Sequence, residues 1–66
     1  MKNKIKIQRA IHGLTQEELA KKINVSRQTI NTMESGKYIP STALALKMAY
    51  LMGISVEELF QLEEND

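Results

Sequence analysis

The stretch LTQEELAKKINVSRQTINTMESGK, residues 14–37, decides the fold of this 66-residue chain. It opens with a capping box, in which Thr15 is followed three residues later by Glu18. The threonine oxygen can accept an N–H from the first turn of a helix, and the glutamate carboxylate can accept the N–H of the threonine. Apolar residues at helical spacing follow, so the spacing predicts a helix over Gln16 to Ile23.

A second helix begins almost at once. Ser26 is a good N-terminal cap and Gly36 a good left-handed stop, so we expect a helix from Arg27 to Ser35. Asn24 is one of the few non-glycine residues that tolerate the left-handed conformation of a tight turn. Two short helices joined in this way cross steeply, which demands a small residue, here Ala20, at the crossing. The apolar residues expected on the inward side are Leu19, Ile23, Val25, Ile30 and Met33.

The rest of the chain shows the same kind of signals and no strand-like alternation. We therefore expect an all-α fold of five short helices in a single domain, residues 1–66, with the central pair of helices at about 16–35. The three outer helices are predicted from Asn3 as cap to about His12, from Ser41 or Thr42 through Met52, and from Ser55 as cap to Phe60.

Composition excludes several classes of protein. Without cysteine and with one histidine, the chain offers no disulfide, no reactive thiol and no ordinary zinc site, and no cofactor is expected. No apolar run approaches the roughly 20 residues of a membrane span, no secretory signal is present, and a cytoplasmic location is expected. A core of this size supplies only roughly 3 to 5 kcal/mol, and burial between two copies is a common remedy. Dimerisation is therefore expected.

Charge is distributed unevenly along the chain. Residues 1–37 carry eight basic and three acidic side chains, a net +5, whereas residues 38–66 carry one basic and five acidic side chains, a net −4. The N-terminal half can meet a polyanion while the acidic tail stays away from it. An ordinary solvated surface explains the charges equally well when they are taken alone.

The spacing of the two central helices resembles the Cro/CI-type (XRE) helix-turn-helix family over roughly Ile5 to Phe60. This resemblance implies a five-helix domain, double-stranded DNA as partner and repressor activity, as in the small stand-alone repressors of the family. Two positions depart from the family pattern: Gln8 is usually apolar, and Asn24 replaces a glycine. Gln8 leaves open which face of the first helix packs, because Ile5 lies on one face and Ile7 and Ile11 on another. We expect Ile5 to face the core and Ile7 to pack against the C-terminal segment.

If Ile30 and Met33 point inward, helical geometry turns a polar face outward from the same helix. Its side chains can read bases in the major groove: arginine can donate twice to guanine, and amides can match adenine. The base-reading set is predicted to be Arg27, Gln28, Asn31 and Thr32.

The family resemblance implies further roles. Gln16 and Ser26, at the starts of the two central helices, would contact DNA phosphates, and Lys37 and Tyr38 are well placed to do the same. Arg9 and Glu34 would form a partly buried structural ion pair. The resemblance to small repressors also implies that Gln61–Glu63 pair as a short strand with Lys2–Lys4. The expected dimer contact comes from Ile54, Val56, Leu59 and Leu62, with Phe60 in the core.

Functions other than DNA binding have less support in the sequence. Catalysis needs a cluster of reactive side chains, and the sequence offers no cysteine, no Ser-His-Asp set and no glycine-rich phosphate loop. The main alternative is an antitoxin or adaptor that acts chiefly through protein–protein contacts, and an activator is a further alternative within DNA binding. No small-molecule ligand or membrane partner is expected.

Overall fold

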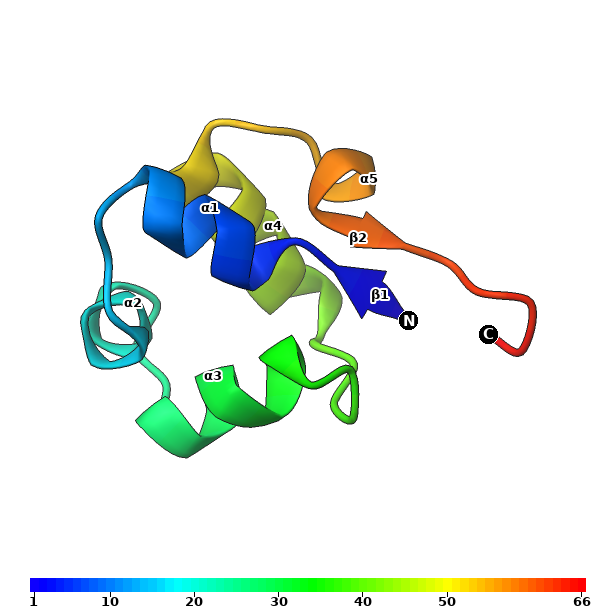
Figure 1. Ribbon diagram of the computed structural model, residues 1–66, viewed down its shortest axis with the longest axis horizontal. Coiled ribbons are helices and arrows are strands. Elements are labelled where there is room, and N and C mark those ends of the chain that lie inside the picture. Colours follow the sequence, from blue (N-terminus) through cyan, green and yellow to red (C-terminus); the bar gives the residue numbers. More distant parts are fainter.

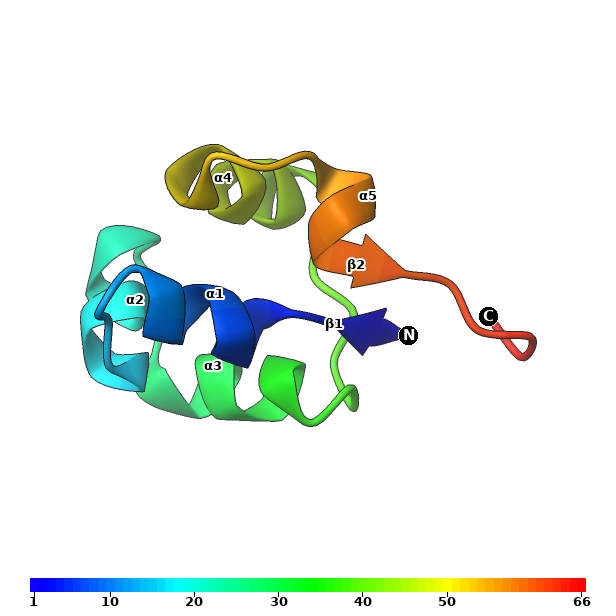
Figure 2. The same ribbon diagram turned by 45° about the horizontal axis from the view of Figure 1, so that its top comes forward.

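Five short helices and two short strands make up residues 1–66 in a computed structural model (Figure 1). In chain order these are β1 (Lys2–Asn3), α1 (Ile5–Ile11), α2 (Gln16–Lys22), α3 (Arg27–Glu34), α4 (Thr42–Met52), α5 (Val56–Leu59) and β2 (Phe60–Gln61). Figure 2 shows α4 and α3 on opposite sides of the molecule with α1 between them. None of these helices is both long enough and apolar enough to cross a membrane. The expected five-helix architecture is confirmed.

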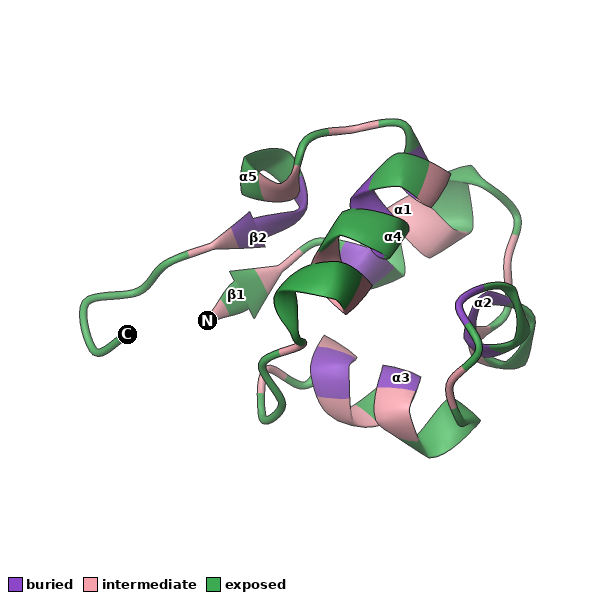
Figure 3. Ribbon diagram, turned by 180° about the vertical axis from the view of Figure 1, so that it is seen from behind, coloured by how far each residue is buried: buried purple, intermediate pink, exposed green.

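The core is built by every helix and by β2, as the burial colours of Figure 3 show. Six of its side chains have no exposed surface: Ile5, Leu19, Ile30, Met33, Met48 and Leu59. The inward positions predicted for α2 and α3 are confirmed, since Ala20 and Ile23 are also buried and Val25 packs against the cluster. Ile5 faces the core as expected, and so does Phe60.

Both predicted capping boxes are present. The Thr15 hydroxyl accepts the Glu18 N–H at 3.0 Å, and the Glu18 carboxylate accepts the Thr15 N–H at 2.9 Å. Ser55 and Glu58 repeat the arrangement at the start of α5. These bonds favour the charged carboxylates, so the pKa values of Glu18 and Glu58 lie below their usual range.

The turn between α2 and α3 depends on Asn24, the one non-glycine residue with positive φ, at 59°. Its left-handed backbone brings the Val25 N–H within 2.9 Å of the Ala20 carbonyl, which ends α2 and starts the chain toward α3. Ser26 then caps α3 by accepting the Thr29 N–H at 3.1 Å. The turn is therefore held by the left-handed main chain at Asn24 and by the capping side chain of Ser26.

Three expectations about the outer elements were wrong. Lys4, not Asn3, occupies the cap position of α1, although the Asn3 oxygen still accepts the Ile5 N–H at 3.2 Å. Ile7 is 59% exposed instead of packing against the C-terminal segment, because α1 turns its Ile5 face to the core. Leu59 is completely buried and cannot lie on a dimer surface, because α5 is a single turn whose last residue points into the core.

The two ends of the chain pair as an antiparallel ladder, at the end of the molecule away from α2 (Figure 1). Lys2 lies opposite Gln61 and Asn3 opposite Phe60, and the Lys4 N–H donates to the Leu59 carbonyl at 2.9 Å. The predicted pairing of the ends is thus confirmed with a shifted strand, Phe60–Gln61 in place of Gln61–Glu63. The shift arises because the chain becomes extended already at Phe60.

The left-handed turn gives the first testable prediction. Asn24→Ala should lower the free energy of unfolding by about 1 kcal/mol, because a β-carbon without a polar group is disfavoured at positive φ. For a domain of this size the melting temperature should fall by about 4 to 8 °C. Asn24→Gly is the matched control, since it removes the same side chain without the conformational penalty. Equal losses in both variants, measured by thermal circular dichroism, would contradict this account of the turn.

Candidate nucleic-acid interface

Helix α3 has one buried face and one polar face. Ile30 and Met33 fix the inward side, while Arg27, Gln28 and Asn31 are exposed on the other. In both views of Figures 1 and 2 the outer side of α3 faces no other element. A helix with a free polar face and a firmly packed inner face can enter the major groove of DNA.

Thr32, the fourth predicted base-reading residue, is half-buried. Its hydroxyl donates to the Gln28 carbonyl at 2.8 Å, which is a bond within the helix. The Gln28 amide nitrogen lies 3.5 Å from the same hydroxyl. Thr32 therefore supports Gln28, and its hydroxyl is already bonded within the helix.

Two shallow hollows flank this polar face. One is lined only by polar side chains, from the start of α2 and the first two turns of α3: Gln16, Arg27, Gln28 and Asn31. The other joins α3 to the following loop and is lined by Gln28, Thr29, Thr32 and Tyr38. The structure thus brings Gln16 and Tyr38 beside the predicted base-reading residues. Lys37 is exposed next to Tyr38, in the same loop.

An ion pair anchors α3 from behind, as expected. The Arg9 Nε donates to Glu34 Oε2 at 2.6 Å, and a second guanidinium nitrogen donates to Oε1 at 3.2 Å. The third nitrogen donates to the Leu14 carbonyl at 3.0 Å, so the same arginine also holds the loop between α1 and α2. The bonds to Glu34 raise the pKa of Arg9 above its usual range.

The sequence did not predict what Glu34 does on its other side. Its Oε1 also accepts a hydrogen bond from the Gln16 amide nitrogen at 3.1 Å. The same nitrogen lies 3.5 Å from Oδ1 of Asn31, to which it donates a second, longer bond. Gln16 therefore turns its donor end inward and its oxygen outward. A phosphate contact by Gln16 would have to come from its main-chain N–H, which lies in the first turn of α2 and has no intrahelical acceptor.

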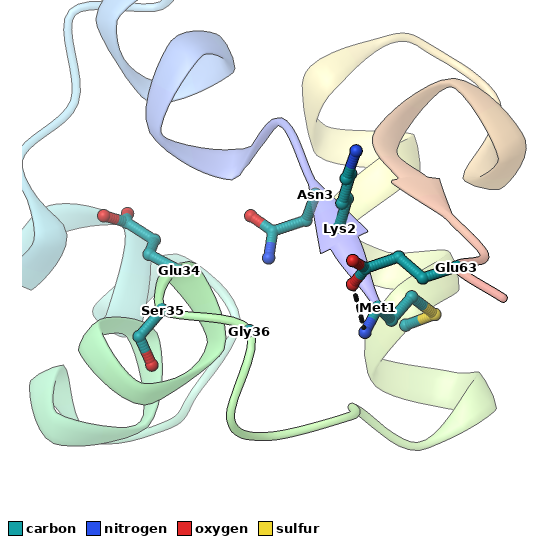
Figure 4. A pocket seen from close by; sticks show the side chains of 7 residues that line it. All are labelled: Met1, Lys2, Asn3, Glu34, Ser35, Gly36 and Glu63. Atoms are coloured by element: carbon teal, nitrogen blue, oxygen red, sulfur yellow. Dashed lines mark ion pairs between the residues drawn. The ribbon is translucent and has the colours of Figure 1, made fainter. Parts of the chain in front are cut away.

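The far end of α3 is fastened to the N-terminal strand (Figure 4). The Asn3 amide donates to the Met33 carbonyl at 2.7 Å, which satisfies an acceptor at the end of the helix. Gly36 follows with φ at +80°, and a β-carbon there would lie 3.3 Å from the Met1 carbonyl oxygen. The ammonium group of Met1 pairs with Glu63 at 3.1 Å. Both ends of the chain therefore meet beside the end of α3.

Together, the steep α2–α3 pair and the free polar face of α3 define a DNA-binding helix-turn-helix protein. Comparison with known proteins agrees, because a helix-turn-helix family model matches residues 5–59. An uncharacterized HTH-type transcriptional regulator of Methanocaldococcus jannaschii is 54% identical over the full length of both chains. A similar regulator of Bacillus subtilis is 44% identical, also over the full length of both, and one of Archaeoglobus fulgidus is 46% identical over all of this chain and 94% of its own. The chain belongs to the XRE-type helix-turn-helix family of DNA-binding transcriptional regulators.

The second testable prediction concerns the ion pair behind α3. Arg9→Ala or Glu34→Ala should each lower the free energy of unfolding by about 3 kcal/mol, because each leaves a mostly buried charge without its partner. A double variant, Arg9→Met with Glu34→Leu, should lose less than either single variant, since apolar groups of similar size replace the pair. Urea denaturation measures all three. A double variant that loses more than either single variant would contradict this account of the pair.

Proposed function

We propose that this regulator is a repressor that binds a pseudo-palindromic operator as a homodimer. The observation that carries the proposal is the exposed set Arg27, Gln28 and Asn31 on a helix whose other face is fully buried. These side chains match base edges in the major groove, whereas phosphate contacts alone carry no sequence information. Lys37, Tyr38, Ser26 and the main chain at Gln16 surround them as the expected phosphate contacts.

Ser26 can serve DNA binding and folding at once. Its hydroxyl accepts the Thr29 N–H and lies 2.9 Å from the Thr29 hydroxyl, so its capping role is occupied within the protein. The N–H groups of Arg27 and Gln28, the first two residues of α3, have no intrahelical acceptor. A phosphate at this position would be bound mainly by the main chain, with Ser26 holding the helix start in place.

Two copies are needed because one reading helix is short. Helix α3 has eight residues, a length of about 12 Å, so one subunit contacts only a few base pairs. A symmetric dimer doubles the contacts and places the two reading helices about 34 Å apart, in successive major grooves.

The free apolar surface near the C-terminal region is the proposed contact. An apolar hollow lies between the start of α4 and α5, lined among others by Pro40, Ala45, Leu46, Val56 and Phe60. Leu62, just after β2, is 80% exposed, and Leu46 is 56% exposed. Ile54 and Val56 are half-buried against the core, and of these two Val56 lines the hollow. Because Leu59 is buried, the proposed dimer contact consists mainly of Leu62 and the residues that line the hollow.

Binding to the operator is enough for repression. A dimer bound over a promoter excludes polymerase without any further contact, whereas activation needs an additional surface for polymerase. Because each subunit of the dimer would contact phosphates, the affinity for DNA should depend steeply on salt concentration. Repression of this kind requires no small-molecule ligand.

An adaptor or antitoxin role is the second candidate, and one observation favours it. Ile7 and Ile11 lie one turn apart on the same side of α1 and are 59% and 68% exposed, and Tyr50 on α4 is 90% exposed. Exposed apolar side chains of this size are typical of protein contacts when they form one patch.

A repressor and an adaptor differ in a gel shift at low salt: only the repressor binds the DNA upstream of its own gene more tightly than random DNA.

The third prediction tests the reading helix. Arg27→Ala or Gln28→Ala should weaken specific binding by about 1 to 3 kcal/mol and relax the preference at one or two base pairs. Lys37→Ala should instead weaken binding to all sequences alike and reduce the salt slope by about one unit. Fluorescence anisotropy titrations at several salt concentrations separate the two effects. Wild-type affinity and preference in both α3 variants would remove this helix from the interface.

The fourth prediction tests the dimer. Leu62→Glu should raise the dissociation constant of the dimer at least about tenfold, because it introduces a charge into an apolar contact, which corresponds to about 1.4 kcal/mol. Ile7→Glu is the matched control, since it charges another exposed apolar residue outside the proposed contact. Sedimentation equilibrium at micromolar concentration gives both constants. A wild-type protein that sediments only as a monomer, or a dimer unaffected by Leu62→Glu, would rule out this contact.

A further inference from the structure

The loop that follows α3 carries two of the expected phosphate contacts, Lys37 and Tyr38, and both side chains are exposed. Between Gly36 and Ser41 the main chain makes one hydrogen bond within the protein, from the Lys37 N–H to the Thr32 carbonyl at 3.3 Å. A loop with so few bonds of its own is placed by the way its two ends are held. The end attached to α3 therefore decides where Lys37 lies.

Main-chain bonds close this end of α3. Gly36 has φ at +80°, and its N–H donates to the Met33 carbonyl at 3.0 Å, while Lys37 reaches back to Thr32. The two bonds satisfy carbonyls that the end of a helix otherwise leaves free. Because both lie within one segment, they fix the start of the loop relative to α3 only.

The main chain at this end of α3 receives one hydrogen bond from another part of the chain, and Asn3 donates it. The Asn3 Nδ2 lies 2.7 Å from the Met33 carbonyl oxygen, and its Oδ1 accepts the Ile5 N–H at 3.2 Å. An amide bonded at both ends keeps one orientation, because a flip would set donor against donor and acceptor against acceptor. Asn3 therefore joins the start of α1 to the last turn of α3, and Figure 4 shows it between β1 and that turn.

The main chain beside Asn3 also approaches the loop closely. A β-carbon on Gly36 would lie 3.3 Å from the Met1 carbonyl oxygen. The N-terminal segment thus meets the start of the loop twice, through a side chain and through the main chain. It is itself held in place by the ladder between β1 and β2.

We propose that Asn3 is a positioning residue for DNA binding, which holds the end of α3 so that Lys37 and Tyr38 leave the helix beside its polar face. Tyr38 shares a hollow with Gln28 of that face, which is the arrangement that the Asn3 bond preserves. The inference rests on the proposed phosphate contacts of the loop. It adds a residue outside the two central helices on which those contacts depend, and Asn3 itself does not touch DNA.

The test is DNA binding by the full chain and its variants, each shown by circular dichroism to be folded at the assay temperature. Fluorescence anisotropy is measured at several salt concentrations, on a duplex that the wild type selects from a random pool and on an unselected duplex. Asn3→Ser keeps a neutral acceptor for the Ile5 N–H but is too short to reach the Met33 carbonyl. It should weaken binding to both duplexes by the same factor and reduce the salt slope by about one unit, as expected for Lys37→Ala.

Combined variants separate positioning from a general loss of stability. If Asn3 acts through the loop, Asn3→Ser should weaken binding much less in a Lys37→Ala background than in the wild type. In an Arg27→Ala background its effect should be undiminished, because Arg27 lies at the other end of α3. Gln61→Ala is the matched control, since it removes an amide of the same ladder that bonds only to carbonyls of α5, and it should leave the salt slope unchanged.

Amide hydrogen exchange gives a second readout, without DNA. In Asn3→Ser the N–H groups of Gly36 and Lys37 should exchange several-fold faster relative to the Val25 N–H, which lies before the other end of α3. Asn3→Asp should have the same effect. It serves if the serine variant does not fold, because its carboxylate still accepts the Ile5 N–H and its charge is favourable at the start of a helix.

Three results would each overturn the inference while leaving DNA reading by α3 in place. These are an unchanged salt slope in folded Asn3→Ser, unchanged exchange at Lys37, and a full effect of Asn3→Ser in the Lys37→Ala background. A wild type that retains no duplex from the pool would overturn the proposed function, and this inference with it.

Discussion

The carboxylate of Glu34 is the point on which the arrangement of the helices depends. It accepts hydrogen bonds from Arg9 on α1 and from Gln16 on α2, and it belongs to α3 itself. Apolar packing brings these helices together but leaves their relative orientation loosely determined, because the hydrophobic effect is not directional. Three charge-assisted hydrogen bonds to one group add the missing direction. In a chain with only eleven buried residues, such a clamp sets the orientation of α3 against α1 and α2.

Much of the fold could be predicted because its strongest signals are local. A capping box needs only Thr15 and Glu18, and a left-handed turn needs only a residue such as Asn24. The errors concern the direction in which short helices face. Helix α1 has two turns with apolar residues on two sides, so the sequence could not decide that Ile7 would point away from the core. Helix α5 has one turn, and the burial of Leu59 depends on where β2 then leads the chain.

The candidate site was predictable for a related reason. The polar face of α3 is the complement of its buried residues, and the helical repeat connects the two once Ile30 and Met33 are placed inward. The contacts of Gln16 could not be found in this way. They depend on how steeply α2 crosses α3, and no pattern within either helix records that angle. The bond between Gln16 and Glu34 is therefore a property of the tertiary structure alone.

The ladder between β1 and β2 has a consequence for the order in which the molecule forms and opens. It joins residues that are almost the full chain length apart, so it closes the largest loop in the protein, and the entropy of that closure must be overcome after the local α2–α3 contacts are made. Elements held by few bonds at the chain ends also open first in the native state. Because Asn3 of β1 holds the Met33 carbonyl, each opening of the ends releases the last turn of α3. Fraying at the termini is thus transmitted directly to α3, the helix proposed to read DNA.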